Sequence, residues 1–190
     1  MGLSTTDSNA TIDNDSAIDF AGSNVGNNLV ATAGGQISQS GALTVGGTAD
    51  FTVADGTDVL LHTEANNITG DPSFASSGPG NIANLRYRNI NPGATLPAVG
   101  NVTTDVEIIF NAAAVDLPAM TIGGSLDVTA GGNITDSGDV SVTGAGIFDA
   151  GVNDITLGDT TTADFGDLTV SGGVVAITEN DDITDGGAWS

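Results

Sequence analysis

The chain has no cysteine, which excludes disulfide bonds and metal sites built on thiolates. It has only two basic residues against 24 acidic ones, and its formal net charge is −22. Proteins that bind nucleic acid or an anionic membrane surface do so through basic side chains. We therefore expect no nucleic-acid partner and no membrane insertion. Acidity of this kind favours solubility in an open medium or contact with divalent cations.

Long apolar runs are also missing. None approaches the roughly 20 residues that span a bilayer. Residues 1–6 have neither a basic start nor an apolar core, so no signal peptide is present in this chain. If the native protein is exported, we expect this sequence to be a mature form or an excised fragment.

Aromatic residues make up only 4% of the chain, although 39% of it is apolar. A core must therefore be built from Val, Ile, Leu and Ala, with occasional Phe. The 28 glycines, together with many Thr, Ser, Asn and Asp residues, are typical of short strands separated by tight turns. We expect an all-β fold without long helices.

A short element recurs along the chain, with an isoleucine, a threonine or serine, and a turn that contains glycine. Its copies begin at Ile37, Ile134 and Ile183. The last two are 49 residues apart (183 − 134), and the first two are 97 apart (134 − 37), close to twice that spacing. The sequence therefore predicts a repeat of about 49 residues, made of two rungs of about 22 to 27 residues with three short strands each.

Strands of similar pattern follow one another at similar spacing, as at 106–110, 140–142 and 168–170. Paired hairpin turns of the Asn-Gly or Asp-Gly kind do not recur with the repeat, although they are expected between antiparallel strands. This pattern favours a parallel β-solenoid, in which like strands stack on like. A pair of β-sandwich domains is the alternative.

Residues 62–104 depart from the repeat. They contain four of the five prolines, both arginines, and the only tyrosine and histidine. Prolines at this density do not fit a central strand. We therefore predict a single β-solenoid over residues 1–190, with an irregular insertion or loop at 62–104.

The elements at 134–138, 155–157 and 164–170 resemble the repeats of filamentous-haemagglutinin-like proteins, which are large β-strand repeat exoproteins of bacterial surfaces. The resemblance covers about residues 12–61 and 105–190. It implies a right-handed parallel β-helix, secretion, and a role in adhesion or in extracellular fibres. The secretion domain that begins such proteins is not visible here.

Acidic residues recur at three positions of the repeat. Asp19, Asp116 and Asp164 share one position, Asp136 and Asp185 share another, and Asp58 and Asp154 form a third pair. Stacked carboxylates repel one another, so they either point into water at turns or share a cation such as calcium. Solvated turn residues and weak calcium sites both remain open. We expect no other cofactor.

Arg86, Tyr87 and Arg88 form the only basic segment. They predict a site for an acidic glycan or an acidic protein surface, with stacking on Tyr87 and the guanidinium planes. The alternative is an intramolecular ion pair with acidic residues of the body. His62 has no second histidine or lysine to work with, so we expect a loop residue and not a catalyst. Basic partners for catalytic carboxylates are confined to the two arginines, and we predict that the protein is not an enzyme.

The repeat places the two chain ends at nearly the same phase. The last copy stops at the equivalent of Ser141, and aligning Ile12 with Ile155 places Met1 opposite Gly144. Open solenoid ends expose unpaired strand edges, which favour pairing with another such edge. We therefore predict head-to-tail stacking into a filament, or else a piece cut from a longer array. The residues expected at the joint are Ile12, Ile183 and Trp189.

These features together predict a structural and adhesive extracellular protein, a segment or subunit of a cell-surface fibre that assembles with copies of itself. The alternative is an adhesin module that binds carbohydrate or protein through residues 62–104, on a host or neighbouring cell. No single motif establishes either function.

Overall fold

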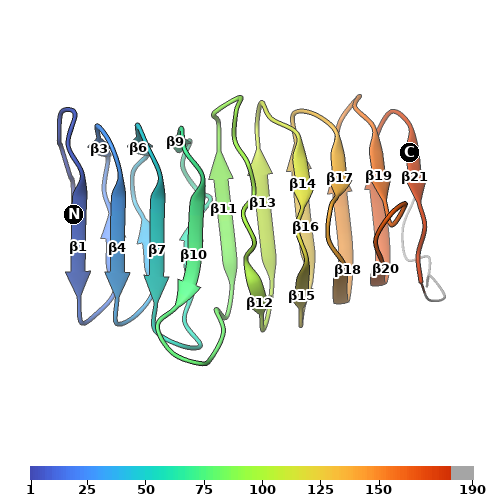
Figure 1. The fold of residues 1–190 in the computed structure, drawn as a ribbon, viewed down its shortest axis with the longest axis horizontal. Helices are drawn as coiled ribbons and strands as arrows, with labels where there is room; N and C mark the ends of the chain where they lie inside the picture. The colour runs from blue at the N-terminus through green and yellow to red at the C-terminus, as the bar shows by residue number, and fades with distance from the viewer. Residues whose placement is uncertain (181–190) are drawn as a thin grey trace.

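The computed structural model describes residues 1–180, which form a parallel β-solenoid of about eight turns (Figure 1). Every strand pair in this part of the chain is parallel. The predicted all-β solenoid is confirmed, and the alternative of antiparallel sandwich domains is wrong. Among the described residues there is no helix long and apolar enough to cross a membrane.

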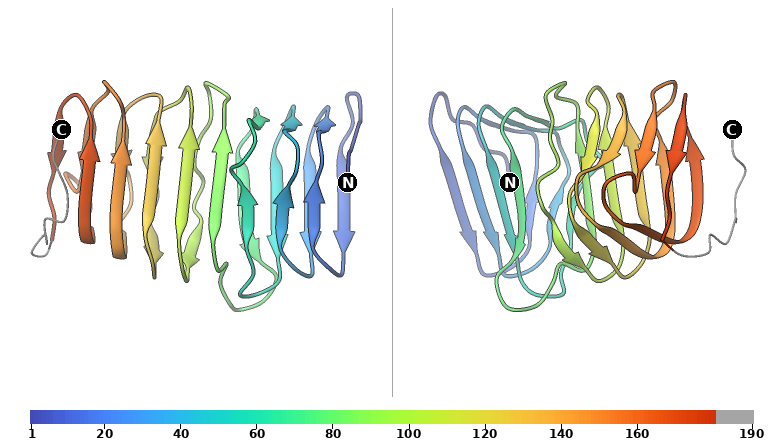
Figure 2. Two further views of the ribbon diagram at one scale, coloured as in Figure 1. Left: turned by 180° about the vertical axis from the view of Figure 1, so that it is seen from behind. Right: turned by 45° about the vertical axis from the view of Figure 1, so that its right-hand side comes forward.

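All turns but the one with β10 and β11 contribute strands to three faces, which we call the first, middle and last face in the order in which the chain visits them. The turns follow one another along the long axis in chain order (Figure 2). The first face contains β1 (Ala10–Asn14), β4 (Leu29–Ala33), β7 (Ala49–Val53), β10 (Pro72–Ser76), β12 (Gly100–Val102), β15 (Met120–Ile122) and the first halves of β18 (Val140–Asp149) and β20 (Ala163–Ser171).

The middle face runs through all the turns without a break. It contains β2 (Ile18–Phe20), β5 (Ile37–Gln39), β8 (Val59–Leu61), β11 (Leu85–Asn89), β13 (Val106–Phe110), β16 (Leu126–Ala130) and the second halves of β18 and β20. Because β18 pairs with β15 as well as β16, the middle face and the later strands of the first face form one ten-stranded sheet.

The last face is divided into two sheets. Its first sheet contains β3 (Ser23–Val25), β6 (Leu43–Val45) and β9 (Asn67–Ile68), and its second contains β14 (Val115–Leu117), β17 (Ile134–Asp136), β19 (Ile155–Leu157) and β21 (Val175–Ile177). The first face is divided at the same level, because β10 ends one sheet and does not pair with β12.

Most turns are shorter than the sequence predicted. Paired residues in successive turns are 19 apart from Ala10 to Leu29 and 20 apart from Leu126 to Gly146, although they are 26 apart from Val59 to Leu85. The turns therefore do not repeat in pairs of 49 residues. Ile37 lies on the middle face and Ile134 on the last face, so the recurring element marks no single place in the turn. Both faces accept it, because each needs an inward isoleucine before a polar corner.

The core is built from inward residues at every second strand position, as in the buried–exposed–buried patterns of β2 and β6. Aliphatic side chains dominate it, as the composition predicted. The aromatic rings are gathered in two groups. One chain of ring contacts joins Phe20, Phe51, Phe74, Tyr87 and Phe110 across the first five turns, and a second contact joins Phe148 to Phe165.

Residues 62–104 contain β9, β10, β11 and β12. Of these, β11 lies between β8 and β13 with every residue of the strand paired to β13. The others border the division of the first and last faces. The prolines lie at or near these borders: Pro72 begins β10, and Pro79 follows it in the corner before β11.

Candidate functional site

On strand β11, the two arginines point to the opposite side of the sheet from Tyr87. The strand alternates, so Arg86 and Arg88 point outward while Tyr87 points inward and is 0% exposed. The expectation that Tyr87 offers a stacking surface to a glycan is therefore wrong. Both arginines have intramolecular partners: Arg86 Nη1 lies 3.7 Å from Glu107 Oε2, and Arg88 Nε donates to Asn111 Oδ1 at 2.8 Å.

Tyr87 belongs to the aromatic part of the core. Its ring lies 5.1 Å from that of Phe74 and 6.0 Å from that of Phe110. Its hydroxyl oxygen is buried without a hydrogen-bond partner of good geometry among the described residues. Burial raises the pKa of this hydroxyl, and the neighbouring Asn89 amide lowers it by less. Tyr87 therefore acts as an apolar ring that carries an unsatisfied polar atom.

Outward side chains of three successive turns form a charged column on the middle face. Arg86, Glu107 and Asp127 occupy the same register position and line a hollow of about 220 Å³. His62 also reaches this column, with Nε2 3.8 Å from Glu107 Oε2. Burial raises the pKa of the Asp127 carboxyl, Glu107 and Asp149 raise it further, and Arg86 opposes them. The column therefore holds one arginine against two carboxylates, and Arg86 offsets only part of their negative charge.

The predicted acidic positions do not gather into one ladder. Asp116 lies on β14 of the last face and accepts a hydrogen bond from Thr135, whereas Asp164 lies on β20, beside Ser141 on β18. Asp136 points inward, is 7% exposed, and accepts bonds from Gly158 N–H and Thr161 Oγ1. Among residues 1–180 there is no group of three or more His, Cys, Asp or Glu residues placed to hold a metal ion.

The residues predicted at the filament joint are only partly placed. Ile183 and Trp189 lie outside the described residues, as does Asp185 of the predicted acidic positions. Ile12 lies on β1 of the first face, whereas Ile155, with which the repeat aligned it, lies on β19 of the last face. That alignment is therefore wrong, and the equal phase of the two chain ends stays a prediction.

Where the last face divides, a side chain replaces the missing strand. Ile68 in β9 donates its N–H to Asn89 Oδ1 at 3.1 Å, and its carbonyl accepts from Asn89 Nδ2 at 2.9 Å. The primary amide thus satisfies both groups that a neighbouring peptide would satisfy. Asn66 has a similar role one turn earlier, where its side-chain amide forms hydrogen bonds with Gln39, Leu43, Leu61 and Arg88. Both asparagines are buried, and Asn89 seals the β9 side of this break.

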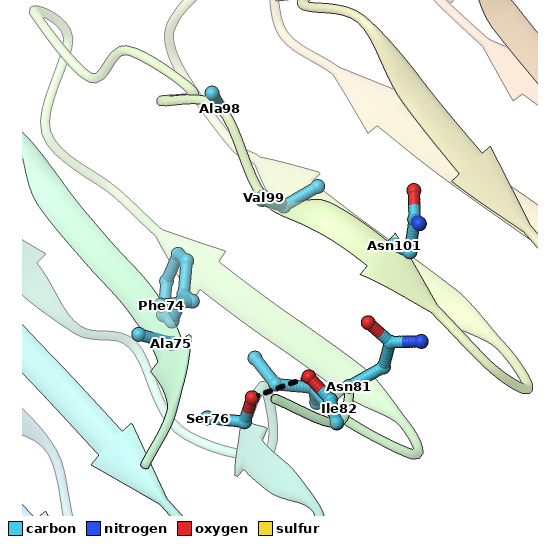
Figure 3. A pocket seen from close by; sticks show the side chains of 9 residues that line it. Phe74, Ala75, Ser76, Asn81, Ile82, Ala98, Val99 and Asn101 are labelled. Carbon is cyan, nitrogen blue, oxygen red and sulfur yellow. Dashed lines mark hydrogen bonds between the residues drawn. The ribbon is translucent and has the colours of Figure 1, made fainter. Parts of the chain in front are cut away.

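Where the first face divides, no side chain fills the space. A cavity of about 290 Å³ lies there, lined by residues of β10 on one side and of 98–101 on the other (Figure 3). Gly80, Asn81 and Ile82, in the chain after β10, also line it. Asp55, in the equivalent corner of the preceding turn, accepts from Gly78 N–H and Gly80 N–H, each at 3.1 Å. A Cβ at Gly80 would lie 2.7 Å from the Asp55 carboxyl carbon, so this loop depends on glycine.

The sequence did not predict the roles of Asn66, Asn89 and Asp55. For Asn89 a signal was present: in the run Leu85 to Asn89 the alternation assigns the asparagine to an inward position. A polar residue in such a position must find partners inside the fold. Asp55 gave no comparable signal, because its partners lie 23 and 25 residues away.

A family of repeats matches most of the chain, at residues 7–75 and 99–163. The unmatched residues between these segments begin at the end of β10 and stop just before β12, so the interruption coincides with the division of the first face. No curated protein and no solved structure matches the chain. Since the two matched segments cover more than half of the sequence, the chain belongs to the family described as repeats of unknown function (DUF5649).

Proposed function

We propose that this protein is a structural β-solenoid of an extracellular surface fibre, and that it associates by pairing the open edges of its terminal turns. Three features support the proposal: a repeat architecture, a core that continues from turn to turn, and the edge of β1. That strand has a neighbour on one side only, β4. The open edge of β1 is the observation that carries the proposal.

Inward side chains at this edge are only partly covered, because no turn packs against them on the outer side. Ile12 is half-buried, whereas its register partners in the next two turns, Ala31 and Phe51, are 0% exposed. A hollow of about 350 Å³ lies beside it, lined in part by Met1 and Ile18. A further turn laid on this end would bury the exposed part of Ile12 and of its neighbours.

Backbone groups at the same edge point away from the body. Ala10 N–H donates to Asn28 O in the next turn. Because N–H and C=O directions alternate along a parallel strand, those of Thr11 and Asp13 point outward. Residues near the start of the chain already pair with β3, as in the Ser4–Asn24 bridge. β2 also has a single neighbour, β5, but Met1 O already accepts from Ala21 N–H beside it. The longest free pairing edge at this end is therefore that of β1.

The net charge of −22 opposes end-to-end contact between copies. Salt screens such repulsion, with a Debye length of about 10 Å at 0.1 M. We therefore expect association to increase with ionic strength or with calcium. Extracellular localisation is part of the proposal: the charge and the absence of cysteine are compatible with it.

The test compares particle length for the purified protein and two variants, by negative-stain microscopy and sedimentation at several salt and calcium concentrations. Ile12→Glu places a charge on the edge and is expected to give single solenoids. Val30→Glu places the same charge on an outward position of β4 and is expected to leave rods intact. Strictly monomeric wild-type particles under every condition would contradict the proposal.

A further inference from the structure

The division of the first face leaves two strand edges facing one cavity. On β10, the direction of the backbone groups follows from the register. Ala10, Leu29 and Pro72 occupy one column, and the N–H groups of Ala10 and Leu29 both donate to the following turn, at 2.8 and 2.9 Å. Since directions alternate along a strand, the N–H and C=O groups of Phe74 and Ser76 point toward the following turn as well.

No strand receives these groups, because β10 pairs with β7 alone. The next residue, Ser77, donates its N–H to Val53 O in the preceding turn at 2.8 Å. Because directions alternate, this confirms that the groups of Ser76 point toward the following turn. Pro72 occupies the column position whose N–H would point into the division, and proline has no N–H to leave unpaired. The free edge of β10 is thereby limited to residues 74–76.

The other side of the cavity shows the complementary edge. Thr103 N–H points back and donates to Ile82 O at 3.0 Å. By the same alternation, the backbone groups of Asn101 and Val99 point back as well. Ile82 pairs with Val102 at the end of this edge, so the groups that face the cavity are those of Val99 and the N–H of Asn101. Figure 3 shows Phe74 and Ser76 on one side of the space and Val99 and Asn101 on the other.

The space is kept open by the contacts of the intervening loop. Asp55 binds the loop at Gly78 and Gly80, and Asn81 O accepts from Gly56 N–H at 2.9 Å. Both contacts hold residues 78–81 against the preceding turn, before Ile82 pairs with Val102 at the end of β12. On the last face, the N–H and C=O of Ile68 in β9 are satisfied by Asn89, whereas no side chain of the described residues does this for the edge of β10.

We propose that this cavity binds an extended peptide of a partner protein by strand pairing with β10 on one side and residues 99–101 on the other. Strand dimensions of ~3.3 Å rise, ~4.8 Å spacing and ~10 Å sheet separation give roughly 160 Å³ per residue, so about 290 Å³ accommodates roughly two residues between the edges. The site lies on the flank of the solenoid, so the proposal does not depend on end-to-end stacking.

The lining and the charge define the chemistry of the peptide. Phe74, Ile82 and Val99 line the cavity, which favours an apolar side chain at the centre of the bound segment. Outside the cavity the protein is strongly acidic, with a net charge of −22 and with Asp55 beside the loop. Basic residues flanking the apolar centre complement that charge.

The probe is a capped peptide of alternating valine and threonine with two lysines at each end. Its binding is measured by isothermal calorimetry and by amide shifts of the isotopically labelled full chain. We expect the amide signals of Phe74, Ser76 and Asn101 to shift. A matched peptide with proline at its centre, and one with glutamates in place of the lysines, are each expected to bind at least about tenfold more weakly, the effect of ~1.4 kcal/mol.

Two variants test the protein side. Ser76→Pro and Asn101→Pro each remove one N–H that faces the cavity, and each is expected to weaken binding by about tenfold. Val152→Pro, in a turn where Val152 is 90% exposed, controls for proline elsewhere, and circular dichroism checks the fold of all three. If a proline variant fails to fold, the amide shifts of the wild type decide. No binding by the wild type, or binding that shifts none of the three amides, overturns the proposal.

Discussion

Two parts of the solenoid satisfy their buried backbone groups by different means. These are the regular turns between residues 10 and 53 and the distorted part between residues 62 and 104. In the regular turns, backbone groups pair with backbone groups of the next turn, and inward side chains are almost all apolar. In the distorted part, the amides of Asn66 and Asn89 take over some of that pairing. The comparison teaches that in this protein two buried asparagines replace backbone pairing where the last face divides.

The two divided faces within the distorted part differ in turn. On the last face the pairing groups of Ile68 are satisfied by Asn89. On the first face the loop is bound to Asp55 and the edge of β10 remains unpaired. Asn89 contributes stability by satisfying the buried backbone groups of Ile68. The unpaired edge of β10 instead contributes a surface with which another strand can pair.

The largest expected effect comes from removing the internal seal. Asn66→Ala leaves Leu43 N–H and the carbonyls of Leu61 and Arg88 without a partner in the interior. We expect the free energy of unfolding to fall by about 2–3 kcal/mol, the cost of unsatisfied buried groups. Chemical denaturation measures it. Asn24→Ala, at an exposed position of β3, is expected to change stability by less than about 0.5 kcal/mol; equal effects would refute the role of the seal.

A smaller loss of stability is expected at the division of the first face, where Asp55 binds the loop. Asp55→Ala removes two hydrogen bonds to the loop and is expected to cost about 1 kcal/mol. Hydrogen exchange of residues 77–81 should accelerate, while that of β5 should not. Asp159→Ala removes the same charge at an exposed site and serves as the control. Unchanged exchange in the loop would show that Asp55 does not position it.

The aromatic core that crosses the distorted part allows a test of opposite sign. Tyr87→Phe removes a buried hydroxyl that has no hydrogen-bond partner in the described residues and keeps the ring contacts with Phe74 and Phe110. We expect the free energy of unfolding to be unchanged or raised by up to about 1 kcal/mol. Destabilisation beyond that range would mean that the hydroxyl has a partner.

The smallest effect is expected in the charged column. The pKa of the Asp127 carboxyl is raised in the folded protein, chiefly by burial and by Glu107, so the folded state holds this proton more tightly than the unfolded state. Its charge therefore lowers stability as pH rises through the ordinary carboxyl range and above. Asp127→Asn should raise the Tm at neutral pH, and the difference should vanish in acid.

Asp139 provides the matched control with the opposite sign. The Thr162 backbone N–H and side chain lower the pKa of this carboxyl, so its contribution to stability is present at neutral pH and is lost as pH falls through the lowered pKa. Asp139→Asn should therefore lower the Tm at neutral pH, with a difference that disappears in acid. Shifts of the same sign in both variants would contradict the assigned causes.

Part of the candidate site could have been predicted from the sequence. The alternation in Leu85 to Asn89 already assigns Tyr87 and Asn89 to the interior and the arginines to the surface. The repeated aspartates suggested a ladder instead, because a sequence repeat was equated with a structural one. The structure distributes Asp19, Asp116 and Asp164 over the middle, last and first faces.

The sequence by itself determined the all-β class, the parallel stacking of similar strands and the aliphatic core. These follow from a period of two residues and from composition, which act within a few residues of chain. Only the tertiary structure decided the register of each turn, the division of two faces and the open edge of β10. Those depend on the number of residues in each corner and on contacts such as Asp55 to Gly80, which bring together residues far apart in the chain.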